Sequence, residues 1–305
     1  MDVLILDEHE VERLLDMEDC IALMEEALAA LARGEVTFPL RPVLRAPGEN
    51  HLLGLMPAYR GGDRPLYALK TVAVMPDNPA RGLDAHQGTV TLYDGVTGQT
   101  LAVMNASPVT AIRTAAVTAV ATRRLARSDA RELAIVGAGV QARSHLRALT
   151  GFERIRVASR TREHAEEIAA EIGAEVCDTA EEAVRGADVV VAATSSAEPV
   201  VRREWLKAGA HVNAVGMGRE LDDDTLRDGT LVVDRRESAE VEGKVDPNWI
   251  AAELGEIVIG RAPGRTSPDE LTVFRSLGIA VEDLYAAEYL VRRAQETGTG
   301  TIVAF

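Results

Sequence analysis

Lysine, cysteine, aromatic residues and long apolar runs are all scarce in this chain of 305 residues. No apolar run approaches the roughly 18 residues of a membrane-spanning helix, and the acidic start with its short apolar run does not resemble a secretory signal. The two cysteines, Cys20 and Cys177, lie far apart and lack metal-ligand spacing. We therefore expect buried free thiols, no metal site and a cytoplasmic location.

Positive charge is also in deficit, because 48 acidic residues outnumber 33 basic ones and the formal net charge is −15. This balance argues against nucleic acid or an anionic membrane as a partner. An anionic ligand must therefore be held by a local basic cluster. Among the basic residues the lysines stand out, because there are only three: Lys70, Lys207 and Lys244.

The most informative motif is a glycine turn between an apolar strand at 133–136 and a helix. Gly137 allows a tight turn, Gly139 has no Cβ to block a phosphate, and Ala142 is small enough for close helix–strand packing. The helix N-terminus offers unpaired N–H groups and a partial positive charge. These features predict a dinucleotide-binding site, with about 130 residues of another domain before it.

The rhythm of the chain predicts two domains of different architecture. Short β-like runs within 36–104 alternate with turn clusters and predict a mainly antiparallel sheet, preceded by a helix at 11–31 that stops at Gly34. After an Ala/Thr-rich helix at 108–126, strands and helices alternate, which is typical of a Rossmann-type doubly wound parallel sheet. Strands are predicted at 133–136, 155–158, 189–193, 211–215, 231–233 and 256–259, and helices at 141–149, 162–172, 179–185, 203–207 and 281–296.

The fold class is therefore α/β, with an α+β domain in addition to the dinucleotide-binding domain. We assign 1–125 plus 297–305 to the α+β domain, because the apolar C-terminal tail is expected to return to it, and 126–296 to the dinucleotide-binding domain.

The end of the second parallel strand bears on the choice of nicotinamide cofactor. NAD-selective units place an acidic residue there, about 20 residues after the glycines. This chain instead has Ser159, Arg160 and Thr161, which can donate hydrogen bonds and pair with a 2′-phosphate. The sequence favours NADP(H), with NAD(H) as the alternative.

Three cations of the first domain lie among apolar residues: Arg41, Lys70 within a strand, and Arg113 in the least polar helix. Each alone has an ordinary interpretation as a snorkelling or ion-paired residue. Together they fit a carboxylate-binding site, with His86 as a further candidate.

The chain resembles the ornithine cyclodeaminase/mu-crystallin family. The resemblance is carried from residue 41 to residue 283 by matching strings at 41–42, 56–59, 69–72, 110–116, 137–141, 212–216 and 274–278. The family includes cyclodeaminases, an alanine dehydrogenase and imino-acid reductases, and its members are typically homodimers. The resemblance implies that Arg41, Lys70 and Arg113 act in catalysis and substrate binding, with Leu277 beside them. It implies cofactor contacts at Gly137, Gly139, Val140, Gln141, Ser159, Arg160, Thr161, Thr194, Val215 and Ser276.

One departure from the family pattern bears on the reaction. Cyclodeaminases carry a catalytic aspartate two residues after the glycine of Asn-Ala-Val-Gly, whereas this chain has Gly218 there. Glu220 and Asp222 are candidate replacements from the same loop. The leading hypothesis is therefore an NAD(P)H-dependent reductase of a small carboxylate-bearing α-imino acid. The alternatives are an ornithine cyclodeaminase and an NADPH-dependent binding protein with little catalysis.

Overall fold

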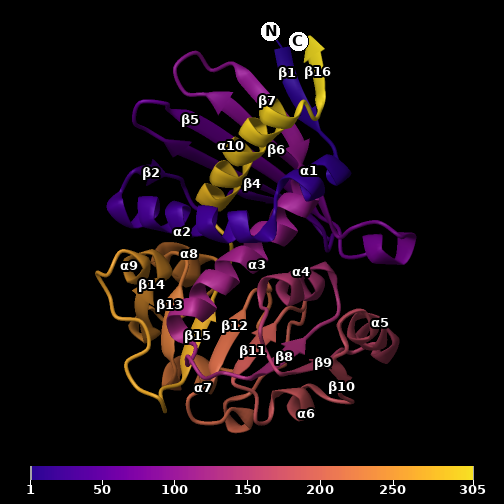
Figure 1. The fold of residues 1–305 in the computed structure, drawn as a ribbon, viewed down its shortest axis with the longest axis vertical. Helices are drawn as coiled ribbons and strands as arrows, with labels where there is room; N and C mark the ends of the chain where they lie inside the picture. The colour runs from indigo at the N-terminus through magenta and orange to yellow at the C-terminus, as the bar shows by residue number, and fades with distance from the viewer. Residues whose placement is uncertain (1, 305) are drawn as a thin grey trace. The chain divides into compact units, whose positions relative to one another are not determined.

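A computed structural model of the chain describes residues 2–304, except for the side chain of Pro79, and it divides into two compact units (Figure 1). The first unit runs to Arg113 and resumes at Ile279, and the second is Thr114–Gly278. The predicted boundaries at 125/126 and 296/297 are therefore wrong. The helix predicted at 281–296 belongs to the first unit, because it packs on that unit's sheet.

The first unit is built on a mainly antiparallel sheet, as predicted. Its strand order is β16-β1-β7-β6-β5-β4-β2, with β3 also paired to β4, and only β1 and β7 run parallel among these neighbours. The C-terminal strand pairs with β1, so the predicted return of the tail is confirmed. The strands are β1 (Asp2–Leu6), β2 (Val36–Thr37), β3 (Val43–Arg45), β4 (Leu52–Arg60), β5 (Leu66–Val74), β6 (His86–Asp94), β7 (Thr100–Asn105) and β16 (Thr301–Ala304).

Three helices accompany this sheet: α1 (Glu8–Leu14), α2 (Met17–Arg33) and α10 (Ala280–Thr297). The predicted helix at 11–31 is two helices, because Asp16 caps a new N-terminus by accepting the N–H of Glu18 at 2.9 Å. Gly34 ends α2 in a left-handed conformation. Figure 1 shows α10 lying across the sheet, and it contacts β4, β5, β6 and α2.

The two faces of this sheet differ in exposure. Lys70 on β5 lies opposite Met56 of β4 and Val90 of β6, and all three are buried on the same face. Residues one position away point to the other face. There Leu55 and Tyr67 are 37% and 49% exposed, so the sheet presents an apolar surface on that side.

The second unit contains a fully parallel sheet, as predicted for a doubly wound fold. Its strand order, β10-β9-β8-β11-β12-β15-β13-β14, reverses direction between β8 and β11. Ligands of such sheets bind at the carboxyl ends of the strands beside this reversal. The strands are β8 (Glu132–Val136), β9 (Arg154–Ala158), β10 (Glu175–Val176), β11 (Val189–Ala192), β12 (His211–Ala214), β13 (Thr230–Val233), β14 (Ile250–Glu253) and β15 (Thr272–Arg275).

The helices predicted at 141–149, 162–172 and 179–185 are present, whereas the helices at Asp223–Asp228 and Arg236–Val241 were not predicted. Residues 203–205 form only a 3₁₀ turn, and the predicted strand at 256–259 is wrong because a helix covers Leu254–Val258. Glu256 accepts the N–H of Glu253 at 2.8 Å, which starts that helix. The helices are α3 (Ala106–Leu125), whose residues up to Arg113 belong to the first unit, α4 (Val140–Ala148), α5 (Arg162–Ile172), α6 (Ala180–Val184), α7 (Asp223–Asp228), α8 (Arg236–Val241) and α9 (Leu254–Val258).

The threonines of α3 supply polar contacts to the second unit. Thr118 contacts His145 of α4 at 3.0 Å, and Thr122 accepts a bond from Asn213 of β12 at 3.1 Å. Burial lowers the pKa of His145 to about 4, so its ring is neutral at physiological pH. The small residues of α3 are buried as well, among them Ala115, Ala116 and Ala121, which fits the close packing that its composition predicts.

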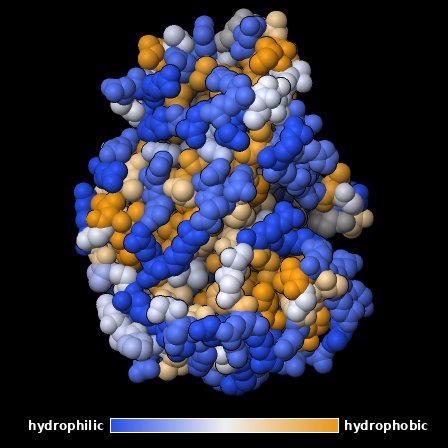
Figure 2. Space-filling view, viewed as in Figure 1, coloured by the Kyte–Doolittle hydropathy of each residue, from blue (hydrophilic) through white to orange (hydrophobic). Residues whose placement is uncertain are grey.

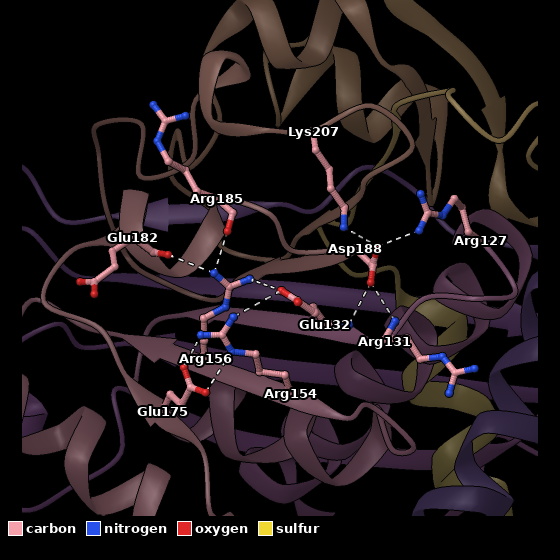
Figure 3. Close-up of polar contacts among 10 residues, drawn as sticks. All are labelled: Arg127, Arg131, Glu132, Arg154, Arg156, Glu175, Glu182, Arg185, Asp188 and Lys207. Atoms are coloured by element: carbon pink, nitrogen blue, oxygen red, sulfur yellow. Dashed lines mark hydrogen bonds and ion pairs between the residues drawn. The ribbon is translucent and has the colours of Figure 1, made fainter.

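A network of charged residues stabilises the amino end of the parallel sheet (Figure 3). Asp188, directly before β11, accepts the N–H groups of Arg131 and Glu132 at 2.8 and 3.0 Å. Its carboxylate also pairs with Lys207 at 2.6 Å and Arg127 at 2.9 Å. Lys207, one of the three lysines, thus has a structural role.

The face shown in Figure 2 is largely polar, with hydrophobic patches between the polar areas. Within residues 2–304, no helix combines the length and apolarity needed to cross a membrane.

Candidate functional site

The predicted cations of the first unit form one cluster centred on Lys70. Lys70 is 2% exposed, and its Nζ lies 2.8 Å from Oδ1 of Asp283 at the start of α10. Arg113 donates to Glu282 at 2.7 Å, and its Nε lies 3.3 Å from Asp283. Two adjacent carboxylates of α10 therefore orient two of the predicted substrate-binding cations.

Arg41 belongs to the same cluster, because its charge acts on both Lys70 and His86. Its aliphatic stem lies over Gly54 of β4, where a Cβ would stand 3.4 Å from Cδ of Arg41. A glycine at position 54 leaves room for this arginine on the buried face of the sheet.

The electrostatics of the cluster favour an anion. Burial lowers the pKa of Lys70 to about 8; Asp283 opposes this shift, whereas Arg113 and Arg41 add to it. Desolvation, together with Lys70 and Arg113, also lowers the pKa of His86 on β6. A neutral histidine beside a mostly protonated lysine leaves a locally positive field in a chain of strongly negative net charge.

Glu282 and Asp283 were missed by the sequence analysis. The available signal was a pair of adjacent acidic residues between apolar residues in the first turns of a helix, since acids that become buried require cationic partners. Leu277, the remaining predicted substrate residue, lies in the second unit.

The glycine turn of the second unit has the conformation that the motif predicts. Gly137 adopts φ +119°, and a Cβ there would stand 2.3 Å from the carbonyl oxygen of Ala193. Gly139 caps α4, with no atom beyond its chain neighbours within 4 Å of where a Cβ would stand. The room at Gly139 and a helix N-terminus without a side-chain cap fit a pyrophosphate.

Two residues of the first turn of α4 remain available to a ligand. Val140 is 52% exposed, and Oε1 of Gln141 is buried without a hydrogen-bond partner in the described structure. An orphaned buried acceptor indicates a missing donor. Both observations fit a bound dinucleotide.

The carboxyl end of β9 carries Ser159, Arg160 and Thr161, the last capping α5 without a side-chain bond. Arg160 is exposed and makes no ion pair within the described part of the chain, whereas nearby Arg162 pairs with Glu166 at 2.8 Å and with Asp178. Arg160 is thus a cation that its own fold does not neutralise.

The loops after β11 and β12 are joined by Glu220, which is 1% exposed. Its Oε1 accepts the N–H and hydroxyl of Thr194 at 2.6 and 2.9 Å, and its Oε2 accepts the N–H of Gly216 at 2.6 Å. Burial raises the pKa of Glu220, and these donors together with Arg275 oppose the rise.

The structure leaves no mobile acid in the 218–222 loop. A Cβ at Gly218 would stand 2.0 Å from the carbonyl oxygen of Ser196. Asp222 caps α7, where it accepts the N–H of Thr225 at 3.0 Å and the N–H of Arg203 at 3.2 Å. Neither Glu220 nor Asp222 is therefore placed to replace the missing aspartate.

The segment after β15, with predicted residues Ser276 and Leu277, is fixed by Asp234. This fully buried carboxylate accepts the N–H groups of Leu277 and Gly278 at 2.7 and 2.8 Å and the Ser276 hydroxyl at 3.3 Å. Arg275 donates to the carbonyl of Gly218 at 2.9 Å and to that of Gly216. Val215 directly precedes Gly216, on the loop after β12. Asp234 and Arg275 were not predicted as site residues, and Glu220 was predicted only as a candidate acid.

Comparison with known proteins places these features in a family context. The model of the ornithine cyclodeaminase/mu-crystallin family matches residues 1–298. Ketimine reductase mu-crystallin of Mus musculus is 41% identical over 280 residues, which cover 87% of this chain and 88% of that protein.

Two solved structures are similar over nearly the whole chain. The Δ¹-pyrroline-2-carboxylate reductase of Thermococcus litoralis, in complex with NADH and L-proline, is 36% identical with a TM-score of 0.92, covering 98% of this chain and 99% of that one. An archaeal alanine dehydrogenase dimer with bound NAD is 32% identical with a TM-score of 0.92, covering 100% of both chains.

Proposed function

The chain belongs to the ornithine cyclodeaminase/mu-crystallin family, and on this basis we propose that it is a nicotinamide-dependent reductase of a small, carboxylate-bearing α-imino acid. The observation that carries this proposal is the buried Lys70 cluster, in which Asp283 and Glu282 orient Lys70 and Arg113. Burial, with a smaller contribution from the neighbouring cations, lowers the pKa values of both Lys70 and His86. The substrates named for the relatives, a ketimine and pyrroline-2-carboxylate, have the same chemistry.

The residues of the cluster have distinct roles in this reaction. Arg41 and Arg113 hold the substrate carboxylate, because a guanidinium presents paired donors to it. Lys70 donates to the bound substrate and supplies the proton that the imine nitrogen takes up. Asp283 and Glu282 keep Lys70 and Arg113 oriented. When bound, the reduced nicotinamide supplies the hydride to the α-carbon, so an imine, a proton and a hydride give the amino acid.

The second unit would hold the dinucleotide with its glycine turn and strand ends. Gly137, Gly139, Val140 and Gln141 would receive the pyrophosphate, and the segments at Thr194, Val215 and Ser276 would flank the nicotinamide half. Because the Thr194 hydroxyl already donates to Glu220, its contribution would come from the methyl group or the backbone.

For the cofactor we favour NADP(H), with NAD(H) as the alternative. Arg160 makes no ion pair with a described residue and follows β9 together with Ser159 and Thr161, where a 2′-phosphate would lie.

A cofactor-oxidation screen tests the function. NADPH and NADH are each incubated with cyclic imino acids, with iminosuccinate, and with pyruvate or glyoxylate plus ammonia or methylamine. We expect oxidation with at least one imino acid and not with the corresponding oxo acid alone. Tight dinucleotide binding without turnover of any of these compounds would instead indicate the binding-protein alternative.

The cyclodeaminase alternative loses support from the structure. It requires an acid near the substrate amine, but position 218 has no room for a side chain and Glu220 and Asp222 are committed elsewhere. Ornithine in the same screen tests this alternative, since a cyclodeaminase forms proline and ammonia without net change of cofactor.

A homodimer and a cytoplasmic location complete the proposal. The dimer is supported by the exposed apolar face of the first sheet, which includes Leu55 and Tyr67, and by the archaeal relative described as a dimer. The location is supported by the free, buried thiols of Cys20 and Cys177.

A further inference from the structure

Glu220 connects three segments at the carboxyl end of the parallel sheet. Its two carboxylate oxygens accept three bonds from Thr194 and Gly216, all between 2.6 and 2.9 Å. Thr194 follows β11 and Gly216 follows β12, so one side chain joins two neighbouring strand ends. Its acceptors are occupied by these donors, which leaves it no role as an acid or base.

The glycine turn lies directly against the segment that Glu220 holds. The N–H of Ala193 donates to the carbonyl of Val136 at 2.8 Å. A Cβ on Gly137 would stand 2.3 Å from the carbonyl oxygen of Ala193 and 3.3 Å from the methyl group of Thr194. Because interiors are close-packed, a shift of Thr194 would displace the turn.

The backbone of Glu220 is itself held in place by the segment at Val200 and Val201. Its carbonyl accepts the N–H groups of Val200 and Val201 at 2.8 and 3.0 Å, and the adjacent Leu221 forms a bridge with Val201. On the loop that it closes, Arg275 binds the carbonyls of Gly216 and Gly218. The backbone of Glu220 is therefore fixed, and its carboxylate holds the loops after β11 and β12.

We infer that Glu220 is a positioning residue for the dinucleotide, because its carboxylate sets the loops after β11 and β12 against the Gly137 turn. The inference rests on the proposed function for the nature of the ligand. Both side-chain oxygens are needed as acceptors, since glutamine in either orientation would place an NH₂ donor against an existing N–H donor.

The test compares Glu220→Gln with the matched control Asp188→Asn. Asp188 is 5% exposed, also accepts two backbone N–H groups, and lies at the opposite end of β11 (Figure 3). Affinities for NADH and NADPH are measured by fluorescence titration without substrate, and each variant's thermal midpoint is recorded. We expect Glu220→Gln to weaken binding of the preferred dinucleotide roughly tenfold or more, and Asp188→Asn to change it less than about twofold at a similar loss of stability.

A kinetic comparison separates positioning from general damage to the fold. Glu220→Gln should raise KM for the dinucleotide and leave KM for the imine near the wild-type value. Unchanged dinucleotide affinity in Glu220→Gln, or an equal loss in Asp188→Asn, would overturn the inference. If Glu220→Gln does not fold, Glu220→Asp decides, because it keeps the charge but is one methylene too short to join both loops.

The binding titration contains no imine, so its result is independent of the proposed reaction. A wild-type protein that binds the dinucleotide but reduces no imino acid would overturn the reductase proposal and leave the role of Glu220 to be judged by the variants.

Discussion

Replacing Asp283 with asparagine should move the pH range over which the enzyme works. The proposed mechanism needs Lys70 in its protonated form, and burial lowers the pKa of Lys70 to about 8. In the wild type, kcat/KM should therefore fall as the pH rises through about 8. Asp283, at 2.8 Å, is the main group that resists this lowering, so its removal must lower the pKa of Lys70 further.

The size of the shift follows from the strength of the lost bond. A charge-assisted hydrogen bond contributes roughly 1.5–3 kcal/mol. Because one pKa unit corresponds to about 1.4 kcal/mol, the pKa should fall by about one to two units. The decline of kcat/KM in Asp283→Asn should then be centred near pH 6–7. The variant should still fold, because Lys70 can become neutral when residue 283 is an uncharged asparagine.

The assay is kcat/KM for the best imine of the screen between about pH 5 and 10, at saturating cofactor and constant ionic strength. Glu288→Gln is the matched control, since Glu288 is on the same helix but pairs with Arg60 at 2.8 Å. The control should retain the decline near pH 8. The reasoning is refuted if the decline in Asp283→Asn lies at or above the wild-type position, or if the wild type shows no decline between pH 7 and 9.

Three further predictions concern the second unit. Arg160→Ala should raise KM for NADPH about tenfold with little effect on NADH, whereas Arg162→Ala should change neither, and an unchanged NADPH value would contradict the NADP(H) preference. Gly218→Asp should form no proline from ornithine and should destabilise the fold, because even the Cβ of the new side chain would stand 2.0 Å from the Ser196 carbonyl oxygen. If this variant forms proline and ammonia without net cofactor change, position 218 can carry the catalytic aspartate after all. Burial acts to raise the pKa of Asp188, but Lys207 and two backbone N–H donors outweigh burial, so the pKa is lowered. The contribution of Asp188 to the free energy of unfolding is therefore present above the ordinary pKa of 3.8 and is lost as the pH falls. Asp188→Asn should therefore lower the free energy of unfolding by about 2–4 kcal/mol at pH 7 and by much less near pH 3, as measured by urea titration.

The sequence predicted best what is encoded locally. The strand, glycine turn and helix at 133–148 form within one short stretch, and each residue type there has a conformational reason. The antiparallel sheet followed from alternation and turn residues in the same way. The error at 256–259 arose because a β-branched run favours a strand, whereas the capping contact between Glu253 and Glu256 starts a helix.

Long-range pairs could not be predicted from a single sequence. Lys70 and Asp283 are 213 residues apart, and no local pattern connects them. For the same reason the helix that carries Asp283 was assigned to the wrong unit, since its periodicity shows an apolar face but not which sheet receives it. Glu220 was predicted as a candidate acid, and only the positions of Thr194 and Gly216 reveal that its oxygens are occupied.

The two ends of the parallel sheet use buried carboxylates in different ways, and this contrast identifies the ligand end. At the amino end, Asp188 is matched by the side-chain cations Lys207 and Arg127, so the charges there neutralise one another. At the carboxyl end, Glu220 is held by backbone and hydroxyl donors, with Arg275 only at 3.9 Å. Independently of Glu220, the N-terminus of α4 has no side-chain cap, and the exposed Arg160 makes no ion pair with a described residue, so both keep their positive potential for another partner. In a chain with a formal net charge of −15, positive groups that the fold does not neutralise favour a bound anion, and here they lie at the strand ends where the glycine turn independently predicts the dinucleotide.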